Sequence, residues 1–317
     1  MKRIVFLSLI VFVLLPNFAD AQRWKRYRRQ IVGGIGVTNF LGDLGGANAI
    51  GRDGFVDLDF GATRPSLFVG YRYQLNGAIF LRSNLQWGML RGDDSNTEFE
   101  DRKGRNLQFR SGYIDLNAMA EFYLFQNARG NLYRLRGVRG RKGLNLDLYV
   151  FGGIGFMYFN PKAEFRGQWV ALQPLGTEGQ GLPGQAEKYS RFTFNIPYGI
   201  GIGKSIDRYT AVNFEMTMRM TFTDYIDDVS GNFYGKDLLI EEWTSQGASQ
   251  AEAEKIAALS DRNIYRELNP KRGGYDEDGD MLPGVQRGDP SDKDAFLAFT
   301  VSISRKIVKR RRSRPKF

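Results

Sequence analysis

The sequence predicts an all-β chain: an eight-stranded antiparallel transmembrane β-barrel with long extracellular loops. Three observations carry this prediction. Eight segments alternate apolar and polar residues with a period of two, the connections between them alternate between long and short, and the chain begins with a secretory signal. Alternate side chains of a strand point to opposite faces, so this period gives each strand one apolar face and one polar face.

A secretory signal peptide is predicted for residues 1–21. Lys2 and Arg3 precede the apolar stretch IVFLSLIVFVLL, and Ala19-Asp20-Ala21 forms an A-x-A cleavage site. A transmembrane anchor is the weaker alternative, because the apolar stretch is about half of the ~20 residues that a spanning helix needs. Cleavage after Ala21 would change the formal net charge from +10 to +9.

The eight strands are expected wherever the alternation is sustained. It is clearest in 212–222, where Phe214, Met216 and Met218 alternate with polar and charged residues. In chain order the predicted strands lie within 30–39, 67–73, 79–89, 114–124, 146–158, 192–202, 212–222 and 297–303. One such strand alone fits a soluble antiparallel sheet equally well. Eight of them with alternating connection lengths favour a membrane barrel over a soluble β-sandwich.

The connections give the expected orientation. Strands two and three, and strands six and seven, are joined by a few residues, whereas four other connections have roughly 16 to 70. Outer-membrane barrels have long outside loops and short periplasmic turns, so both termini are expected in the periplasm. The link 127–145 between strands four and five is the exception, because it is too long and too basic for a simple turn.

The polar faces are expected to line a narrow lumen. An eight-stranded interior is filled by side chains, so an open pore is not expected, and opposite charges can pair inside it. The predicted barrel-interior charge network consists of Arg72, Arg82, Asp115, Glu121, Asp147, Glu215 and Arg219.

Composition argues against catalysis. The 317 residues include no cysteine and no histidine, so thiolate chemistry, the commonest general base and the usual partner of a serine nucleophile are all missing. We therefore expect a protein that is not an enzyme and uses no cofactor; an outer-membrane enzyme relying on aspartates alone is the less favoured alternative. A pI near 9.6 is compatible with nucleic acid, but export and the lack of a binding motif argue against that partner.

Charge is distributed very unevenly. Segment 23–29 carries five basic residues, the link 127–145 carries six and the tail 305–317 carries eight, all without an acid, whereas 224–294 holds 17 acids against 8 bases. We expect a basic periplasmic segment at 22–29, a barrel at 30–308 with a large extracellular loop at 224–294, and a basic periplasmic tail at 309–317.

The three basic clusters predict a docking face for an acidic periplasmic partner. The alternative is that they only contact anionic lipid headgroups or solvent. The predicted partner-binding residues are Arg26, Arg28, Arg29, Arg134, Arg136, Arg139, Arg141, Lys142, Arg310, Arg311 and Arg312.

Two features stand out in the loop 224–294. Residues 249–262 have helical spacing, with Ser249 as a possible N-cap. Asp276, Asp278 and Asp280 resemble the start of a calcium loop, but the sixth position is Met281 rather than glycine and the twelfth is Arg287 rather than glutamate. A solvated acidic turn is therefore expected, and no metal site is predicted.

Four phrases resemble the PorG-like outer-membrane barrels of the Bacteroidota type IX secretion and gliding machinery. They are GGIGVTNFLGDL (33–44), TFTDYIDDVSGNF (221–233), AALSDRN (257–263) and DAFLAFTVSISRKI (294–307). The most specific part is TDY-x-DDVSG, with motif residues Thr223, Asp224, Tyr225, Asp227 and Asp228.

The resemblance implies a small outer-membrane barrel that associates with the periplasmic ring of the secretion machine, which is built from a lipoprotein and its partner. Outer-membrane lipids and lipopolysaccharide are further expected contacts. The basic tail and the link 127–145 depart from the family pattern. The alternative function is a surface ligand-binding or narrow-channel outer-membrane protein outside secretion.

Overall fold

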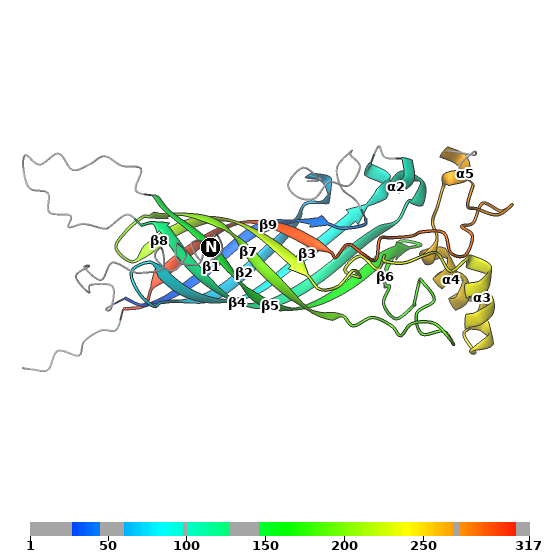
Figure 1. Ribbon diagram of the computed structural model, residues 1–317, viewed down its shortest axis with the longest axis horizontal. Helices are drawn as coiled ribbons and strands as arrows, with labels where there is room; N and C mark the ends of the chain where they lie inside the picture. Colours follow the sequence, from blue (N-terminus) through cyan, green and yellow to red (C-terminus); the bar gives the residue numbers. More distant parts are fainter. Residues whose placement is uncertain (1–26, 45–59, 98–99, 127–145, 269–272, 309–317) are drawn as a thin grey trace, which may run out of the picture.

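Eight antiparallel strands form a closed barrel (Figure 1). The computed structural model describes residues 27–44, 60–97, 100–126, 146–268 and 273–308. The barrel strands are β1 (Arg29–Leu41), β2 (Arg64–Gln74), β3 (Ile79–Asp93), β4 (Gln108–Phe125), β5 (Leu146–Phe165), β7 (Phe192–Ser205), β8 (Thr210–Thr221) and β9 (Ala295–Lys306). Because β1 pairs with both β2 and β9, and β4 with both β3 and β5, the described strands close on one another. The predicted fold class is confirmed.

A short additional strand, β6 (Gln168–Ala171), pairs with the last residues of β5. Sequence reasoning missed it. Arg166 and Gly167 form the two-residue connection, with φ of 49° and 79°. Positive φ at both positions is the geometry of the tight hairpin turns that match the twist of paired strands.

The connections separate by length, as predicted. The short ones, 75–78 and 206–209, lie at one end, which we call the turn end, together with residues 27–28 and 307–308. The long ones, 42–63, 94–107, 166–191 and 222–294, join strands at the opposite end, which we call the loop end. The link 127–145 joins strands at the turn end but lies outside the described residues.

The barrel wall is apolar outside and polar inside, as the period of two predicts. On the outer face Ile35, Ile154 and Phe194 are 72%, 69% and 61% exposed, whereas inward-facing Ser111, Asp115 and Glu121 are fully buried. A large continuous apolar surface marks a contact with lipid or with another protein. Here it surrounds a closed barrel, which is the arrangement that a bilayer requires.

Helices gather at the loop end (Figure 1). They are α2 (Glu100–Arg105), α3 (Lys236–Ser245), α4 (Gln250–Ser260) and α5 (Tyr265–Leu268), with 3-10 turns η3 (Phe60–Ala62) and η4 (Asp94–Asn96). The predicted helix is α4, and the Ser249 side chain caps it by accepting a hydrogen bond from the Glu252 amide at 3.3 Å. Of the helices that the structure describes, none is long and apolar enough to cross a membrane.

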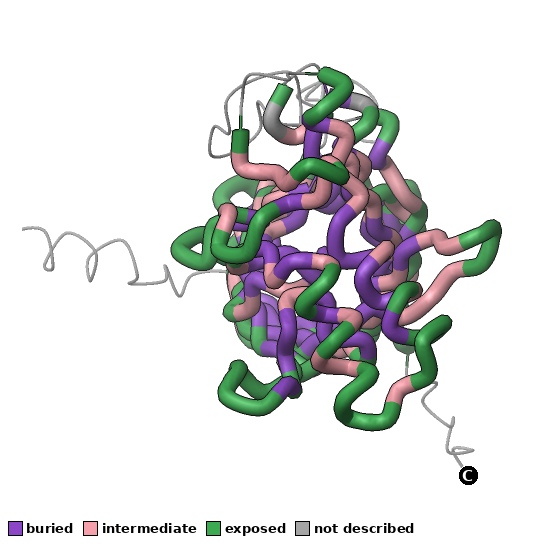
Figure 2. Tube along the Cα trace, turned by 90° about the vertical axis from the view of Figure 1, so that its right-hand side faces the viewer, coloured by how far each residue is buried: buried purple, intermediate pink, exposed green. Residues whose placement is uncertain are grey.

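The loop-end segments form a folded cap with its own apolar contacts. Ile256 and Leu259 of α4 pack against Leu172 and Leu175 of the β5–β7 connection. Viewed along the barrel from the loop end, buried stretches of chain lie across the mouth (Figure 2). We use "cap" below for 42–44, 94–107, 166–191 and 222–294 as far as they are described.

Candidate functional site

Two arginines and two glutamates form an ion-paired quartet in the lumen. Arg72 on β2 and Arg82 on β3 lie opposite each other in the sheet. The Nη2 atom of Arg72 is 2.9 Å from Glu121 Oε1, and the Nη1 atom of Arg82 is 2.6 Å from Glu215 Oε1. None of the four residues is more than 2% exposed. Removal of four charges from water is unfavourable, and the mutual pairing offsets it.

Aromatic rings surround the quartet on its turn-end side. The Tyr149 hydroxyl donates a hydrogen bond of 2.5 Å to Glu215 Oε1, and Tyr123 stacks on Tyr149 at 4.7 Å between ring centroids. The Arg82 guanidinium lies 5.3 Å from the centroid of the Phe151 ring. These contacts hold the charged groups in one arrangement and fill the space beside them.

A second ion pair lies nearer the loop end. Arg219 Nε is 3.4 Å from Asp115 Oδ2, and the amides of Asn117 and Asn195 donate to the same carboxylate at 2.7 and 2.8 Å. Arg219 also donates to the side-chain oxygen of Gln86. Every oxygen of Asp115 thus has a partner, which buried carboxylates require.

The structure brings six of the seven predicted lumen residues into these two clusters. Arg72, Arg82, Glu121 and Glu215 form the quartet, and Asp115 and Arg219 form the second pair. The seventh, Asp147, lies half-buried at the turn end of β5, opposite Gly203.

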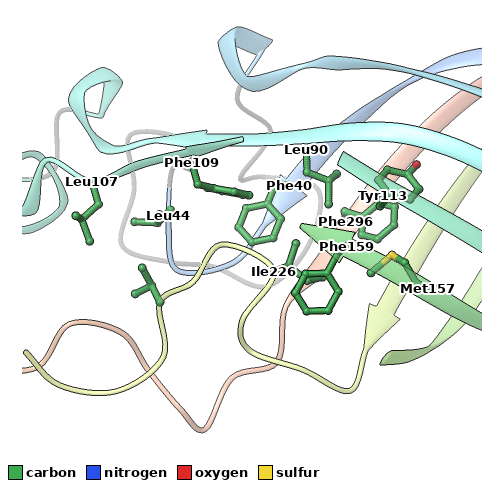
Figure 3. Close-up of a cluster of buried hydrophobic side chains, with 11 residues drawn as sticks. Phe40, Leu44, Leu90, Leu107, Phe109, Tyr113, Met157, Phe159, Ile226 and Phe296 are labelled. Carbon is green, nitrogen blue, oxygen red and sulfur yellow. The ribbon is translucent and has the colours of Figure 1, made fainter. Parts of the chain in front are cut away.

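An apolar plug fills the loop end of the lumen (Figure 3). Ile226 and Val229 come from the β8–β9 connection and are 0% and 1% exposed. They pack with side chains from the barrel wall and from two other connections in one cluster of Phe40, Leu44, Leu90, Leu107, Phe109, Tyr113, Met157, Phe159, Ile226, Val229 and Phe296. Tyr123 and Tyr149 form a third layer, which we call the tyrosine layer. The plug, the ion pairs and the tyrosine layer fill successive levels of the interior, as expected for a narrow barrel.

The motif 223–231 anchors the cap to the barrel mouth. Asp227 accepts hydrogen bonds from the Leu44 amide at 3.1 Å and the Val229 amide at 3.0 Å, and so holds the motif beside the end of β1. Asp228, with φ of 70°, accepts from the hydroxyls of Thr177 and Tyr189, both at 2.5 Å. The motif therefore stabilises the loop end.

The other motif residues serve the same purpose. The Thr223 carbonyl accepts a hydrogen bond of 3.1 Å from the amide of Asp294, which precedes β9. Tyr225 stacks on Tyr189 with centroids 4.5 Å apart. Asp224 is 4% exposed. All five predicted motif residues therefore lie at the foot of the cap.

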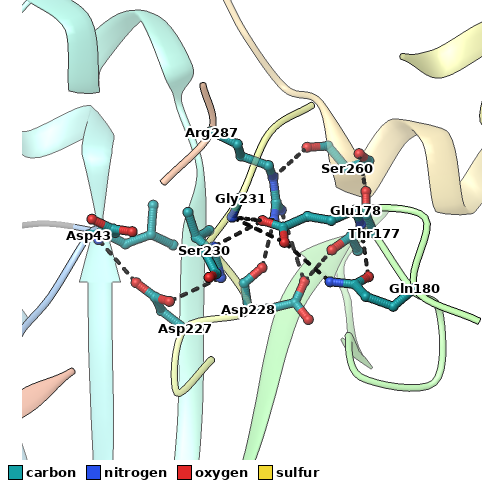
Figure 4. A network of polar contacts seen from close by, with 12 residues as sticks. Asp43, Thr177, Glu178, Gln180, Asp227, Asp228, Ser230, Gly231, Ser260 and Arg287 are labelled. Carbon is teal, nitrogen blue, oxygen red and sulfur yellow. Dashed lines mark hydrogen bonds and ion pairs between the residues drawn. The ribbon is translucent and has the colours of Figure 1, made fainter. Parts of the chain in front are cut away.

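Arg287 connects three segments of the cap (Figure 4). This connecting role was not predicted from the sequence. Its Nη1 atom lies 2.8 Å from Glu178 Oε1 and donates to the Asp228 carbonyl at 2.6 Å, while Nε donates to the Ser260 carbonyl at 3.2 Å. Glu178 also accepts from the amides of Ser230 at 2.9 Å and of Gly231. One guanidinium thus joins the β5–β7 connection, the motif and the end of α4.

Arg105 ties the β3–β4 connection to the same region. It forms a two-pronged ion pair with Asp94, with Nε–Oδ2 at 2.8 Å and Nη2–Oδ1 at 3.1 Å. Its Nη1 atom donates to the carbonyl of Arg287 at 2.6 Å. Such paired, charge-assisted hydrogen bonds are strong and fix orientation.

Burial raises the pKa values of the cap carboxyls. It raises the pKa of Asp228 to about 6, against the opposing charge of Arg287. It raises the pKa of Asp224 to about 7, and the negative charge of Asp43 acts in the same direction. For Asp227 and Asp294, burial and neighbouring acids hold the pKa well above the usual range. Of these groups, Asp224 and Asp228 take up protons in mildly acidic solution.

The acidic turn at 276–280 forms local contacts. The Asp276 carboxylate accepts from the Asp280 amide at 2.8 Å, and Asp280 forms an ion pair with Lys236. Asp278 is exposed. Within the described residues, no three acidic side chains are placed to hold a metal ion.

A group of basic residues, which we call the basic rim, lies at the turn end along the neighbouring strands β7, β8, β9 and β1. It consists of Arg28, Arg29, Lys204, Arg208, Arg305 and Lys306. Arg28 donates to the Tyr73 hydroxyl at 3.2 Å, and Arg208 lies 5.8 Å from the ring centroids of both Tyr27 and Tyr209.

Of the predicted partner-binding residues, Arg28 and Arg29 belong to this rim. The others, Arg26, Arg134, Arg136, Arg139, Arg141, Lys142, Arg310, Arg311 and Arg312, lie outside the described residues.

A closed eight-stranded barrel with an apolar outer wall, a charge-paired lumen and long connections at one end is an outer-membrane β-barrel. No family model matches the chain, and no curated protein matches it either.

Solved structures of small outer-membrane barrels are similar to it. OprG from Pseudomonas aeruginosa shares 9% identity at a TM-score of 0.36, covering 90% of this chain and 98% of that one. The attachment invasion locus protein Ail of Yersinia pestis, in complex with a heparin analogue, shares 10% at 0.34, covering 89% and 99%. Neisserial surface protein A shares 7% at 0.32, covering 89% and 96%. Similarity at this level says nothing about what the chain binds.

Proposed function

We propose that this chain is a non-enzymatic outer-membrane barrel that docks a periplasmic protein assembly through its turn end. One observation carries the proposal: the basic rim lies at the same end of the barrel at which all three basic clusters of the sequence join it. Segment 22–29 leads into β1, the link 127–145 connects β4 with β5, and the tail 309–317 follows β9. Like charges gathered on one face attract an acidic partner and raise its association rate.

The filled lumen supports an anchoring role over a channel. The plug, the quartet and the tyrosine layer place side chains at successive levels of the interior. The narrow-channel alternative therefore has little support. A rigid barrel with a polar, charged end is well suited to holding other proteins at a membrane surface.

The more specific form of the proposal is a component of the type IX secretion system, with a periplasmic lipoprotein and its ring partner as the docked assembly. It rests on the motif 223–231 and on the other phrases that resemble PorG-like barrels. Because the motif residues stabilise the cap, the motif supports common descent rather than a docking contact. The orientation, with the turn end in the periplasm, is part of this proposal.

Purification of the native complex in mild detergent tests the proposal. The test variant replaces Arg134, Arg136, Arg139, Arg141 and Lys142 by glutamine, and a second one replaces Arg29, Lys204 and Arg208. A control replaces the loop-end residues Arg166, Arg266 and Lys293, which are exposed. We expect both turn-end variants to insert normally but to lose the periplasmic lipoprotein at lower salt than the wild type, because screening weakens what remains. The control should retain it.

Retention of the same partners at the same salt concentration by all variants, with secretion unchanged, would contradict the docking role. Recovery of periplasmic proteins unrelated to secretion would contradict only the more specific form.

A surface ligand-binding function is the second candidate, and a cleft in the cap favours it. The cleft has a volume of about 480 Å³ and is lined by both polar and aromatic side chains, among them Gln180, Tyr225, Asn232 and Tyr234. Co-purification of extracellular ligands without any periplasmic protein would support this alternative over docking.

A further inference from the structure

The outer wall has a hollow where the first and last strands meet. It is lined by Ile31, Gly33, Ile303, Arg305, Lys306 and Ile307, with a volume of about 360 Å³. Gly33 pairs with Ile303 across the β1–β9 seam, and Ile31 pairs with Arg305 one step nearer the turn end. The hollow is therefore mainly apolar, and Arg305 lies between Ile303 and Ile307 on its side nearer the turn end.

Glycine creates the hollow. A side chain at position 33 would meet nothing closer than the Phe68 carbonyl oxygen, 3.8 Å from the place of a Cβ. Its outward-facing neighbours Ile31 and Ile303 are 53% and 57% exposed, and their side chains project from the wall beside Gly33. The missing side chain leaves a depression in a surface that otherwise carries large apolar groups.

We infer that this hollow seats an anionic phospholipid, with an acyl chain over Gly33 and the headgroup phosphate against Arg305. The Arg305 position lies two residues along β9 from Ile303, which is roughly 7 Å at the rise of a strand. That spacing places a charged group at the edge of the apolar band while the chain lies along it. Arginine binds phosphate oxygens through several N–H groups in a fixed geometry.

Charge distinguishes this occupant from a second copy of the chain. A symmetric dimer through the hollow would bring the same surface, and hence two Arg305 side chains, together. Arg29, whose carbonyl accepts a hydrogen bond from the Ile307 amide across the same seam, would add to the repulsion. An anionic headgroup instead neutralises these residues. The described carboxylate near Arg305 is Asp207, which accepts the Tyr209 and Thr210 amides at 2.6 and 2.8 Å.

Native mass spectrometry of the purified full chain tests the inference. Delipidated protein is mixed with phosphatidylglycerol or phosphatidylcholine carrying identical acyl chains, and bound lipid is counted. We expect phosphatidylglycerol to be retained at least about tenfold better than phosphatidylcholine, and Gly33→Leu and Arg305→Gln each to lower its retention about tenfold.

Two matched controls separate the site from its surroundings. Gly112→Leu fills an equally open outward position on β4, where a Cβ would meet nothing within 4 Å. Lys204→Gln removes an exposed rim charge from β7. Both should retain the lipid like the wild type. A gel shift on boiling reports that each variant is folded, and Arg305→Gln keeps the test valid if Gly33→Leu does not fold.

Three results would overturn the inference. The first is equal retention of the two lipids by the wild type, the second is unchanged phosphatidylglycerol binding in both test variants, and the third is a lipid-free wild-type dimer that Gly33→Leu dissociates. The last result would assign the hollow to a second copy of the chain.

Discussion

The two ends of the barrel are built differently. At the loop end, connections from four places in the sequence fold into a cap that is held by buried ion pairs such as Arg287–Glu178 and Arg105–Asp94. At the turn end, the described connections are tight turns, such as the one that Asp207 closes, and the charges of the basic rim are largely exposed. The charges of the loop end are used in buried ion pairs, whereas those of the turn end lie mostly at the surface.

Removal of a quartet charge should affect both ends at once. Glu215→Gln leaves Arg72 and Arg82 in the lumen with one carboxylate between them. We expect the free energy of unfolding to fall by about 3 to 5 kcal/mol, because the uncompensated charge stays buried. Urea unfolding in lipid vesicles measures this change. Thr217→Ser, on the same inner face of β8, is the control and should be mild.

Removal of the cap arginine should affect the loop end alone. Arg287→Met leaves the buried carboxylate of Glu178 without its cation. We expect the cap to lose about 2 to 3 kcal/mol while the barrel keeps its stability. Limited proteolysis should then cut within 222–294 before the barrel unfolds. Arg266→Met, an exposed arginine of the same cap, is the control. Simultaneous loss of cap and barrel would show that the two form a single cooperative unit.

The two ends should also differ in how their stability depends on pH. The folded pKa values of Asp224 and Asp228, about 7 and about 6, lie above the usual 3.8. The folded cap therefore binds protons that the unfolded chain releases, and its stability declines as pH rises from about 4 to about 7. We expect slower hydrogen exchange of the Ile226 and Ser230 amides at pH 5 than at pH 8, after correction for intrinsic rates. An unchanged corrected rate would mean that these acids are solvated.

The smallest expected effect has the opposite sign. Backbone amides of Tyr209 and Thr210, helped by Arg305, lower the pKa of Asp207 below 3.8. The turn therefore has this extra stability above pH 3.8, the ordinary pKa of aspartate, and loses it as the pH falls through the lowered pKa of Asp207. Asp207→Ala should slightly weaken the β7–β8 hairpin at pH 7, and this effect should shrink as acid protonates the carboxylate. Hydrogen exchange of the Thr210 amide checks this, and a difference that persists in acid would argue for another cause.

The strands of the barrel wall could be predicted from the sequence because the alternation of apolar and polar residues is a local pattern. Parity alone places Arg72, Glu121 and Glu215 inside, and the eight strands follow from it. It could not show that Arg82 pairs with Glu215, because the two are 133 residues apart and meet only when the barrel closes. The hairpin of β6 was missed, although the Arg166-Gly167 pair between apolar stretches is a turn signal.

The cap was harder to predict for the same reason. Solvation was expected only for the acidic turn with Asp276, Asp278 and Asp280, and the burial of the motif acids was not predicted, although Asp224, Asp227 and Asp228 are 4%, 1% and 1% exposed. Their burial depends on partners from other connections, such as Tyr189 and the Leu44 amide. Distance along the chain hides such partners, and no local pattern reveals them. The Ser249 cap of α4, which is purely local, was predicted correctly.

The quartet also has a consequence for the order of assembly. Arg72, Arg82 and Glu121 lie on β2, β3 and β4, which are neighbours in the chain, but Glu215 arrives with β8. A partly formed sheet that lacks β8 holds two arginines against one glutamate, and that excess charge keeps its inner face hydrated. Water can leave the lumen only when β8 brings the last carboxylate. Drying of the interior thereby depends on β8, which pairs with β9, the strand that closes the cylinder against β1.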